Sequence, residues 1–257
     1  MSLFTKLFKV AAAFILFPVA VFFSIYTLEQ QGFFKIDKVE IRIDTKTSQK
    51  NYISSKIKEL QIKLNSIKGI SLWRAPLSQI SQSLKEEKWI KNFQITRAWP
   101  SGVILTVEPD NVVILVMSQE GIQVGSEATL IRPITESGQL LGKINSNSSP
   151  NAMVTHDSVF LSDQQVRDGA MEIIKSLPET GAMSSAHVSE IGFDKKEGYW
   201  IKLLKSDTKI NFGELQFEIK SARISQVIEY LESRNLKARV IDANLSKKVL
   251  VRLQQNP

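Results

Sequence analysis

Side chains that could do chemistry are few in this sequence, and they are far apart. The chain of 257 residues holds two histidines, His156 and His187, and no cysteine. A zinc site takes three or four ligands from His, Cys or carboxylates, usually at short spacings, so two isolated histidines do not predict one. The absence of cysteine also excludes thiol nucleophiles, disulfides and zinc–thiolate sites.

Other catalytic patterns are equally weak. Gly138–Lys143 resembles a phosphate-binding loop, but it is one residue short and lacks the Ser or Thr after the lysine. The sequence has no G-x-S-x-G nucleophile elbow, and no carboxylate pair stands out as a glycosidase site. We therefore predict that the protein is not an enzyme, with no catalytic residue, no cofactor, no metal ion and no small-molecule substrate.

The charge distribution bears on the partners. The formal net charge is +7, of which Lys6 and Lys9 supply two, and the remaining basic residues are interspersed with acidic ones. A surface that follows nucleic-acid phosphates needs grouped Lys and Arg, so we predict no nucleic-acid partner. The excess of positive charge is compatible with a solvated surface or with attraction to anionic lipid or cell-wall polymers.

The N-terminal segment predicts a membrane anchor. Val10–Leu28 contains no charged residue, and as a helix its 19 residues would reach about 28 Å, close to the roughly 30 Å hydrocarbon core. Lys6 and Lys9 precede it and Glu29 follows it. The positive-inside rule then predicts a cytoplasmic tail at residues 1–9, one transmembrane helix at residues 10–28, and the rest outside the cytoplasm.

A cleaved signal peptide is the alternative interpretation of this segment. Its apolar part would span only about 7–15 residues and end at a small-x-small cleavage site. The apolar run here is longer, and no such site appears around Ser24–Gln31. We therefore expect the anchor to be retained and the chain to cross the membrane once.

Residues 32–110 predict a first domain that begins with one strand and two helices. Apolar side chains alternate along Phe33–Ile43, as in a strand. Residues 53–64 repeat apolar side chains at steps of three and four, and residues 76–84 do so over a shorter stretch that starts with proline. Both segments predict amphipathic helices.

Two strands complete this domain. Ile90–Arg97 and Val103–Glu108 alternate apolar and polar side chains on either side of the turn Trp99–Gly102. The order β-α-α-β-β predicts an α+β fold with helices packed on one face of a small mixed sheet. We expect the core to contain Leu60, Leu84, Phe93 and Leu105.

The remaining residues, 111–257, predict a β-rich domain with two helices and a terminal β-hairpin. One helix is expected to begin with a capping box at Ser162–Gln165, and the other spans about Glu218–Arg234. Lys143–Ala152, rich in Asn and Ser, predicts an exposed loop. The strand candidates are Val112–Met117, Gly121–Val124, Thr129–Ile131, Val188–Phe193, Tyr199–Lys205, Thr208–Phe212, Ala238–Leu245 and Lys247–Gln254.

Lys88–Pro109 resembles the most recognisable segment of the FtsQ/DivIB family of cell-division proteins. That family has Trp-Val-Lys, then Arg-x-Trp-Pro, then an alternating strand that closes on valine and glutamate. Gly69–Trp73 and Phe34–Ile41 are similar to family landmarks further upstream. The matching residues in the main segment are Trp89, Ile90, Lys91, Arg97, Trp99, Pro100, Val107 and Glu108.

The resemblance implies a POTRA domain followed by a β domain. In the second domain it is looser. Trp200, Ile210–Gly213 and Val240–Asp242 are similar to family positions, whereas Ala243–Leu245 stand where the family often has apolar-Arg-Tyr. The family's Asp-x-x-Gly is not evident near Gln123–Ala128.

The resemblance also implies a function. Proteins of this family are bitopic inner-membrane scaffolds at the division septum, whose periplasmic part binds FtsB and FtsL and so helps control septal peptidoglycan synthesis. Two other classes of protein stay open on the residues alone. One is a membrane-anchored periplasmic cell-wall enzyme, and the other is a POTRA-containing transport or chaperone component.

The final strand candidate, Lys247–Gln254, predicts where partners bind. No strand candidate follows it, so its outer edge would expose backbone N–H and C=O groups. In one interpretation Lys247 and Lys248 protect this edge from unwanted strand pairing; in the other, a partner adds a strand to it. Val249, Val251 and Leu253 would face the core, and Leu250 and Arg252 the other side. The family resemblance implies strand addition here, with partner-binding residues Leu245, Lys248, Val249, Leu250, Val251, Arg252 and Leu253.

Overall fold

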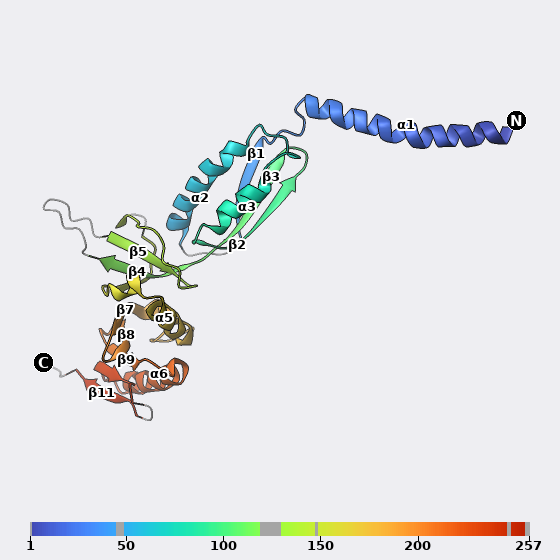
Figure 1. The fold of residues 1–257 in the computed structure, drawn as a ribbon. Helices are drawn as coiled ribbons and strands as arrows, with labels where there is room; N and C mark the ends of the chain where they lie inside the picture. Colours follow the sequence, from blue (N-terminus) through green and yellow to red (C-terminus); the bar gives the residue numbers. More distant parts are fainter. Residues whose placement is uncertain (1, 45–48, 119–129, 147–148, 246–247, 255–257) are drawn as a thin grey trace, which may run out of the picture. The chain divides into compact units, whose positions relative to one another are not determined.

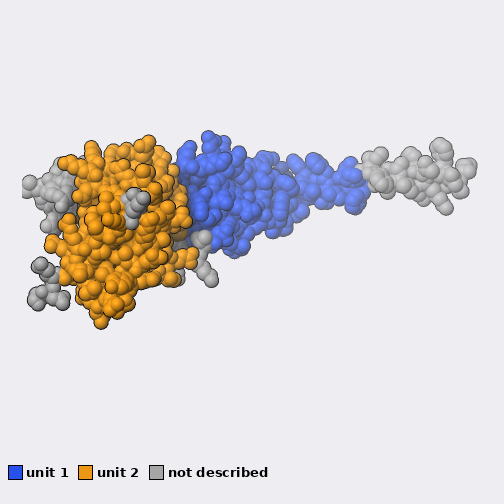
Figure 2. Space-filling view, turned by 90° about the horizontal axis from the view of Figure 1, so that it is seen from below, with its two compact units in different colours: residues 1–46, 53–109 blue, residues 47–52, 110–257 orange. Residues whose placement is uncertain are grey.

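The computed structural model describes residues 2–44, 49–118, 130–146, 149–245 and 248–254, without the side chains of residues 2–15 and Lys50. Figure 1 traces the chain. Two compact units are coloured separately in Figure 2: unit 1 comprises residues 1–46 and 53–109, and unit 2 comprises residues 47–52 and 110–257.

The chain begins with a helix, α1 (Ser2–Gln30), which contains the predicted span 10–28 and Pro18. Within the described residues, no helix combines the length and the apolar character that crossing a bilayer requires. The side chains of residues 10–15, which belong to the predicted span, lie outside the described part. The membrane anchor therefore stays a prediction.

The rest of unit 1 is a small α+β domain with a three-stranded sheet. The strand order is β1-β3-β2, with β1 parallel and β2 antiparallel to β3. Val103, Leu105 and Val107 alternate on the central strand and are buried. The elements are β1 (Lys38–Ile43), α2 (Lys50–Leu64), the 3-10 helix η1 (Asn65–Ile67), α3 (Leu77–Lys85), β2 (Ile90–Ala98) and β3 (Gly102–Pro109).

Two expectations for this domain need correction. The strand expected over Phe33–Ile43 starts only at Lys38, because the residues before it bond to a loop: the Leu72 N–H donates to the Phe34 carbonyl at 2.7 Å, and the Ile36 N–H donates to the Ile70 carbonyl at 2.9 Å. Phe93 is only half-buried, because β2 is an edge strand. The other expected core residues, Leu60, Leu84 and Leu105, are buried.

Unit 2 contains one eight-stranded sheet in the order β11-β10-β9-β8-β7-β6-β4-β5. Helices α5 and α6 share its main core, which includes Ile173, Phe212 and Ile224. The elements are β4 (Val112–Ser118), β5 (Leu130–Thr135), β6 (Met153–Thr155), α4 (Val159–Ser162), α5 (Gln164–Ser176), the 3-10 helix η3 (Ser185–His187), β7 (Val188–Asp194), β8 (Gly198–Leu203), β9 (Lys209–Gly213), α6 (Phe217–Ser233), β10 (Ala238–Asp242) and β11 (Leu250–Leu253).

The start of α5 differs from the expected capping box. Ser162 ends the short helix α4, and Asp163 is the N-cap of α5. The Asp163 carboxylate accepts hydrogen bonds from the backbone N–H groups of Gln165 at 2.8 Å and Val166 at 3.4 Å. The expected strand Gly121–Val124 lies outside the described residues.

Candidate partner-binding edge

The terminal hairpin forms one edge of the large sheet, and its first strand is buried. Ala238 and Ile241 of β10 lie in the core, together with Ala243 just beyond it. The Asp242 carboxylate accepts a hydrogen bond from the Asn244 N–H at 2.9 Å, which turns the chain after β10. The chain then returns as β11, antiparallel to β10.

Two backbone bonds fix which way the amides of this hairpin point. The Gln254 N–H donates to the Lys237 carbonyl at 2.8 Å, toward β10, and the Ala243 N–H donates to the Asn211 carbonyl at 2.9 Å, toward β9. Backbone groups along an antiparallel strand point alternately to its two sides. Arg252 and Leu250 therefore point their N–H and C=O groups at β10, whereas Val251 and Leu253 point theirs outward.

The opposite edge of the same sheet is closed. Beyond β5 the chain folds back along its outer side, where the Leu141 N–H donates to the Pro133 carbonyl at 2.8 Å and the Ile144 N–H donates to the Ile131 carbonyl at 2.9 Å. Pro133 has no N–H to offer a partner. Within the described ranges, no segment covers the outer side of β11 in this way. β11 is therefore the edge at which a further strand can be added.

A shallow hollow of about 620 Å³ lies beside this edge, between β11 and α6. Val249, Val251 and Leu253 line it from the strand side, and Val227 and Tyr230 are among the residues that line it from α6. Val249 and Val251 also pack on the core. The hollow would receive side chains of a segment bound along β11.

The structure brings the predicted partner-binding residues together on this hairpin, with one correction. Leu253, which was expected to face the core, is 48% exposed at the rim of the hollow. Leu250 is 52% exposed, and Leu245, Lys248 and Arg252 are exposed as well. Lys247, the second expected guard, lies outside the described residues.

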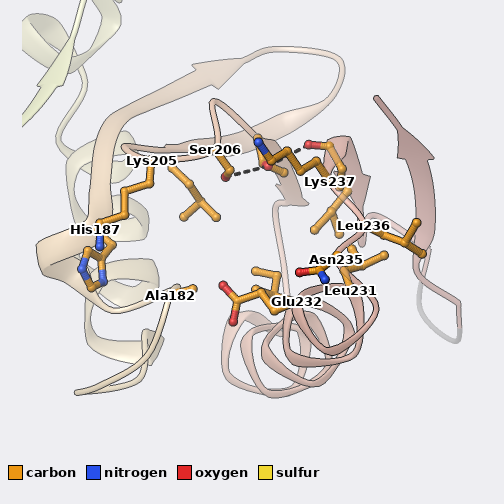
Figure 3. Close-up of a pocket in the computed structure, with 14 residues that line it drawn as sticks. Ala182, His187, Lys205, Ser206, Leu231, Glu232, Asn235, Leu236 and Lys237 are labelled. Carbon is orange, nitrogen blue, oxygen red and sulfur yellow. Dashed lines mark hydrogen bonds between the residues drawn. The ribbon is translucent and has the colours of Figure 1, made fainter. Parts of the chain in front are cut away.

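A second cavity, of about 570 Å³, adjoins the end of the hairpin (Figure 3). Its apolar lining includes Leu203, Ile228 and Ile241. Its titratable groups come from separate elements, among them His187 from η3 and Glu232 from α6.

Hydroxyl groups in this second cavity form hydrogen bonds with other residues that line it. The Thr208 hydroxyl lies 2.7 Å from the Ser206 hydroxyl and 2.8 Å from the Ala238 carbonyl, so it ties the turn after β8 to β10. In the described part of the chain, no cluster of three or more His, Cys, Asp or Glu is placed to hold a metal ion.

Buried polar groups hold α5 and α6 against the sheet. The Lys220 ammonium donates to the Phe212 carbonyl at 2.6 Å, and burial lowers the pKa of Lys220 while Asp242 acts in the opposite direction. The Tyr199 hydroxyl donates to the Val166 carbonyl at 3.1 Å. Burial first, and then the negative charge of Asp163, raise the pKa of Tyr199 to about 12. These contacts link β9 to α6, which borders the hollow, and β8 to α5.

The motif residues of unit 1 have mainly structural contacts. Trp89 is buried, and its indole N–H donates to Glu87 at 3.1 Å. The Arg97 Nε donates to the Leu72 carbonyl at 3.1 Å, and Glu108 pairs with Lys91 at 3.3 Å. Pro100 follows Trp99 in a cis peptide bond in the turn between β2 and β3. Trp99 differs from the others because half of its surface is exposed.

Sequence reasoning missed the α6 side of the hollow. Tyr230 is exposed on α6, although Ile228 and Leu231 of the same helix are buried, and Leu236 is exposed just after the helix ends. Large apolar side chains on the outer face of an amphipathic helix are the signal that could have indicated this surface.

Comparison with known families decides the identity of the first domain. Residues 34–108 match the family model of an FtsQ-type POTRA domain. This chain carries an FtsQ-type POTRA domain. The matched residues include nearly all of Lys88–Pro109, the segment of this chain that most resembles the FtsQ/DivIB family. The match therefore confirms that resemblance, and it points to a role in cell division. A search of curated proteins found no match to the chain.

Proposed function

We propose that this protein is a non-catalytic cell-division scaffold of the FtsQ/DivIB type. Its residues 10–28 anchor it once in the inner membrane, and residues 29–257 lie in the periplasm, concentrated at the septum. There it recruits small bitopic partners of the FtsB and FtsL type and so helps control septal peptidoglycan synthesis. The FtsQ-type POTRA domain supports the division role.

The observation that carries the binding mechanism is the contrast between the two edges of the large sheet. The outer side of β5 is bonded to the chain that follows it, whereas Val251 and Leu253 of β11 point their backbone groups outward. An extended partner segment can therefore add a strand at β11.

The size of this interaction can be worked from the backbone. Val251 and Leu253 offer two N–H and two C=O groups, hence up to four hydrogen bonds at about 0.5–1.5 kcal/mol net each, or about 2–6 kcal/mol together. Association itself costs about 4–15 kcal/mol. The partner's side chains must supply the rest, and the hollow between β11 and α6 is where they would be buried.

Photo-crosslinking in cells tests this proposal. A photoreactive residue at Leu250, exposed on β11, should crosslink the full chain to a small bitopic membrane protein. The same residue at Gln94, exposed on the edge strand β2 of the other sheet, is the matched control and should not. A fluorescent fusion should gather at the septum. Crosslinking of the same partner from Gln94 alone would contradict docking at β11.

A further inference from the structure

The FtsQ-type domain exposes a cluster of aromatic rings that the binding edge does not use. Phe33, Trp73 and Trp99 are 51%, 56% and 52% exposed, and Phe34 is nearly buried among them. The ring centres of Trp73 and Trp99 lie 4.5 Å apart, and those of Phe33 and Phe34 lie 5.2 Å apart. Phe34 contacts both tryptophans, with centres 5.9 and 6.0 Å away.

Three segments of the domain build this aromatic cluster, and hydrogen bonds hold them together. The Leu72 N–H donates to the Phe34 carbonyl, and the Arg97 side chain donates to the Leu72 carbonyl. Phe34, Leu72 and Arg97 are each within two residues of an exposed ring. The rings are thus held on a fixed scaffold, and contiguous exposed apolar surface of this kind marks an interaction site.

The aromatic cluster is joined directly to the end of α1. The Phe33 N–H donates to the Leu28 carbonyl at 3.0 Å, and the Gly32 N–H donates to the Glu29 carbonyl at 3.0 Å. Phe33 follows Gln30 by three residues, a chain length of at most about 11 Å. If residues 10–28 span the bilayer, Phe33 lies at the level of the headgroups, where aromatic side chains are enriched at membrane interfaces.

Charge around the aromatic cluster favours one kind of surface. Residues 29–40, 68–75 and 97–102 contain five basic and three acidic residues, a net charge of +2. The acidic residues are Glu29, Asp37 and Glu40, and Glu40 pairs with Lys38 at 3.6 Å. Basic groups beside a membrane are attracted to anionic lipids. The basic residues are Lys35, Lys38, Lys68, Arg74 and Arg97.

We propose that Phe33, Trp73 and Trp99 insert into the headgroup layer of an anionic bilayer and form a second membrane contact besides the anchor. This contact holds the FtsQ-type domain against the membrane surface. It deepens the proposed function and rests on the anchor at residues 10–28. A tryptophan ring suits this layer, because its body is apolar while its N–H still reaches water.

Quenching of tryptophan fluorescence by lipid tests the contact. The full chain is reconstituted in phosphatidylglycerol–phosphatidylcholine vesicles whose acyl chains carry bromine near the headgroup, which quenches only rings in contact with lipid. We expect quenching in the native chain and its loss in the double variant Trp73→Phe, Trp99→Phe. Trp89→Phe, which removes a buried ring, is the matched control and should keep the quenching.

Alkaline extraction of the same vesicles reports the anchor separately. Suppose that the chain resists extraction, which supports the anchor. Quenching that is as strong in the double variant as in the native chain, or no quenching of the native chain, would then overturn the second contact and leave the anchor standing. A chain that is extracted yet quenched through Trp73 and Trp99 would overturn the anchor and keep the lipid contact. Extraction without quenching would overturn both. Equal quenching in pure phosphatidylcholine vesicles would overturn the preference for anionic lipid.

Discussion

Proline at position 253 should weaken partner binding while leaving the fold in place. Leu253 points its N–H outward, because the Gln254 N–H is bonded to β10. Proline lacks that donor and is tolerated on an edge strand where the N–H faces solvent. The side chain of Leu253 is half exposed, so its replacement creates no large cavity in the core. We therefore expect little change in the melting temperature.

The loss of affinity can be estimated from one hydrogen bond. Removal of the donor leaves an acceptor of the bound strand unsatisfied, which costs about 1–3 kcal/mol. At 1.4 kcal/mol per factor of ten, the dissociation constant should rise about 5- to 150-fold. Binding of the purified full chain to its co-purified partner, measured by titration calorimetry in detergent, would show this change.

Two control variants separate backbone from side-chain effects. Leu253→Ala shortens the same side chain but keeps the N–H, so the difference between the alanine and proline variants isolates the backbone donor. Arg252→Pro removes an N–H that points at β10 and should lower the melting temperature as well as the affinity. If Leu253→Pro binds as tightly as Leu253→Ala, the direction of strand addition derived from Gln254 is refuted.

Three further predictions concern stability. Leu105→Ala should lower the free energy of unfolding by about 2–5 kcal/mol and the half-buried Phe93→Ala by less, measured by urea denaturation; equal losses would argue against β2 as an edge. Asp163→Ala should cost about 1 kcal/mol through its N-cap whereas Ser162→Ala should cost almost nothing, and thermal unfolding showing the reverse order would restore the capping box. The raised pKa of Tyr199 predicts that stability falls as pH rises from about 10, where the unfolded phenol ionises, to about 12, where the folded one does; below pH 10 this tyrosine makes stability neither rise nor fall with pH. Phenolate absorbance should show this late titration, and Tyr199→Phe should remove it; a tyrosine set that titrates entirely near pH 10 would contradict the burial.

Periodicity in the sequence predicted the order of the helices and strands of the POTRA domain, although β1 starts at Lys38 and not at Phe33. The strands Ile90–Arg97 and Val103–Glu108 are present within one residue at each end, because each alternates cleanly and a Pro-Ser-Gly turn separates them. β6 was missed, since three residues, Met153–Thr155, are too few to show a period. The capping box was misplaced because an extra helical turn, α4, uses Ser162.

The sequence predicted a strand at this edge of the sheet, but not the geometry of that strand. A terminal strand was evident, yet its alternating side chains did not show which residues point their N–H groups outward. Leu250 and Arg252 point their N–H groups toward β10, because backbone groups alternate along the strand and the Gln254 N–H is bonded to the Lys237 carbonyl. The register of β11 on β10 depends on tertiary pairing, which no local pattern of side chains encodes.

Amide hydrogen exchange of the full chain, alone and bound to its co-purified partner, tests the docking edge most directly. The account predicts fast exchange at Val251 and Leu253 in the free chain and strong protection of both in the complex. Gln254, which donates to the Lys237 carbonyl, should be protected in both states. Unchanged exchange at Val251 and Leu253 on binding, with new protection along β2 instead, would contradict strand addition at β11.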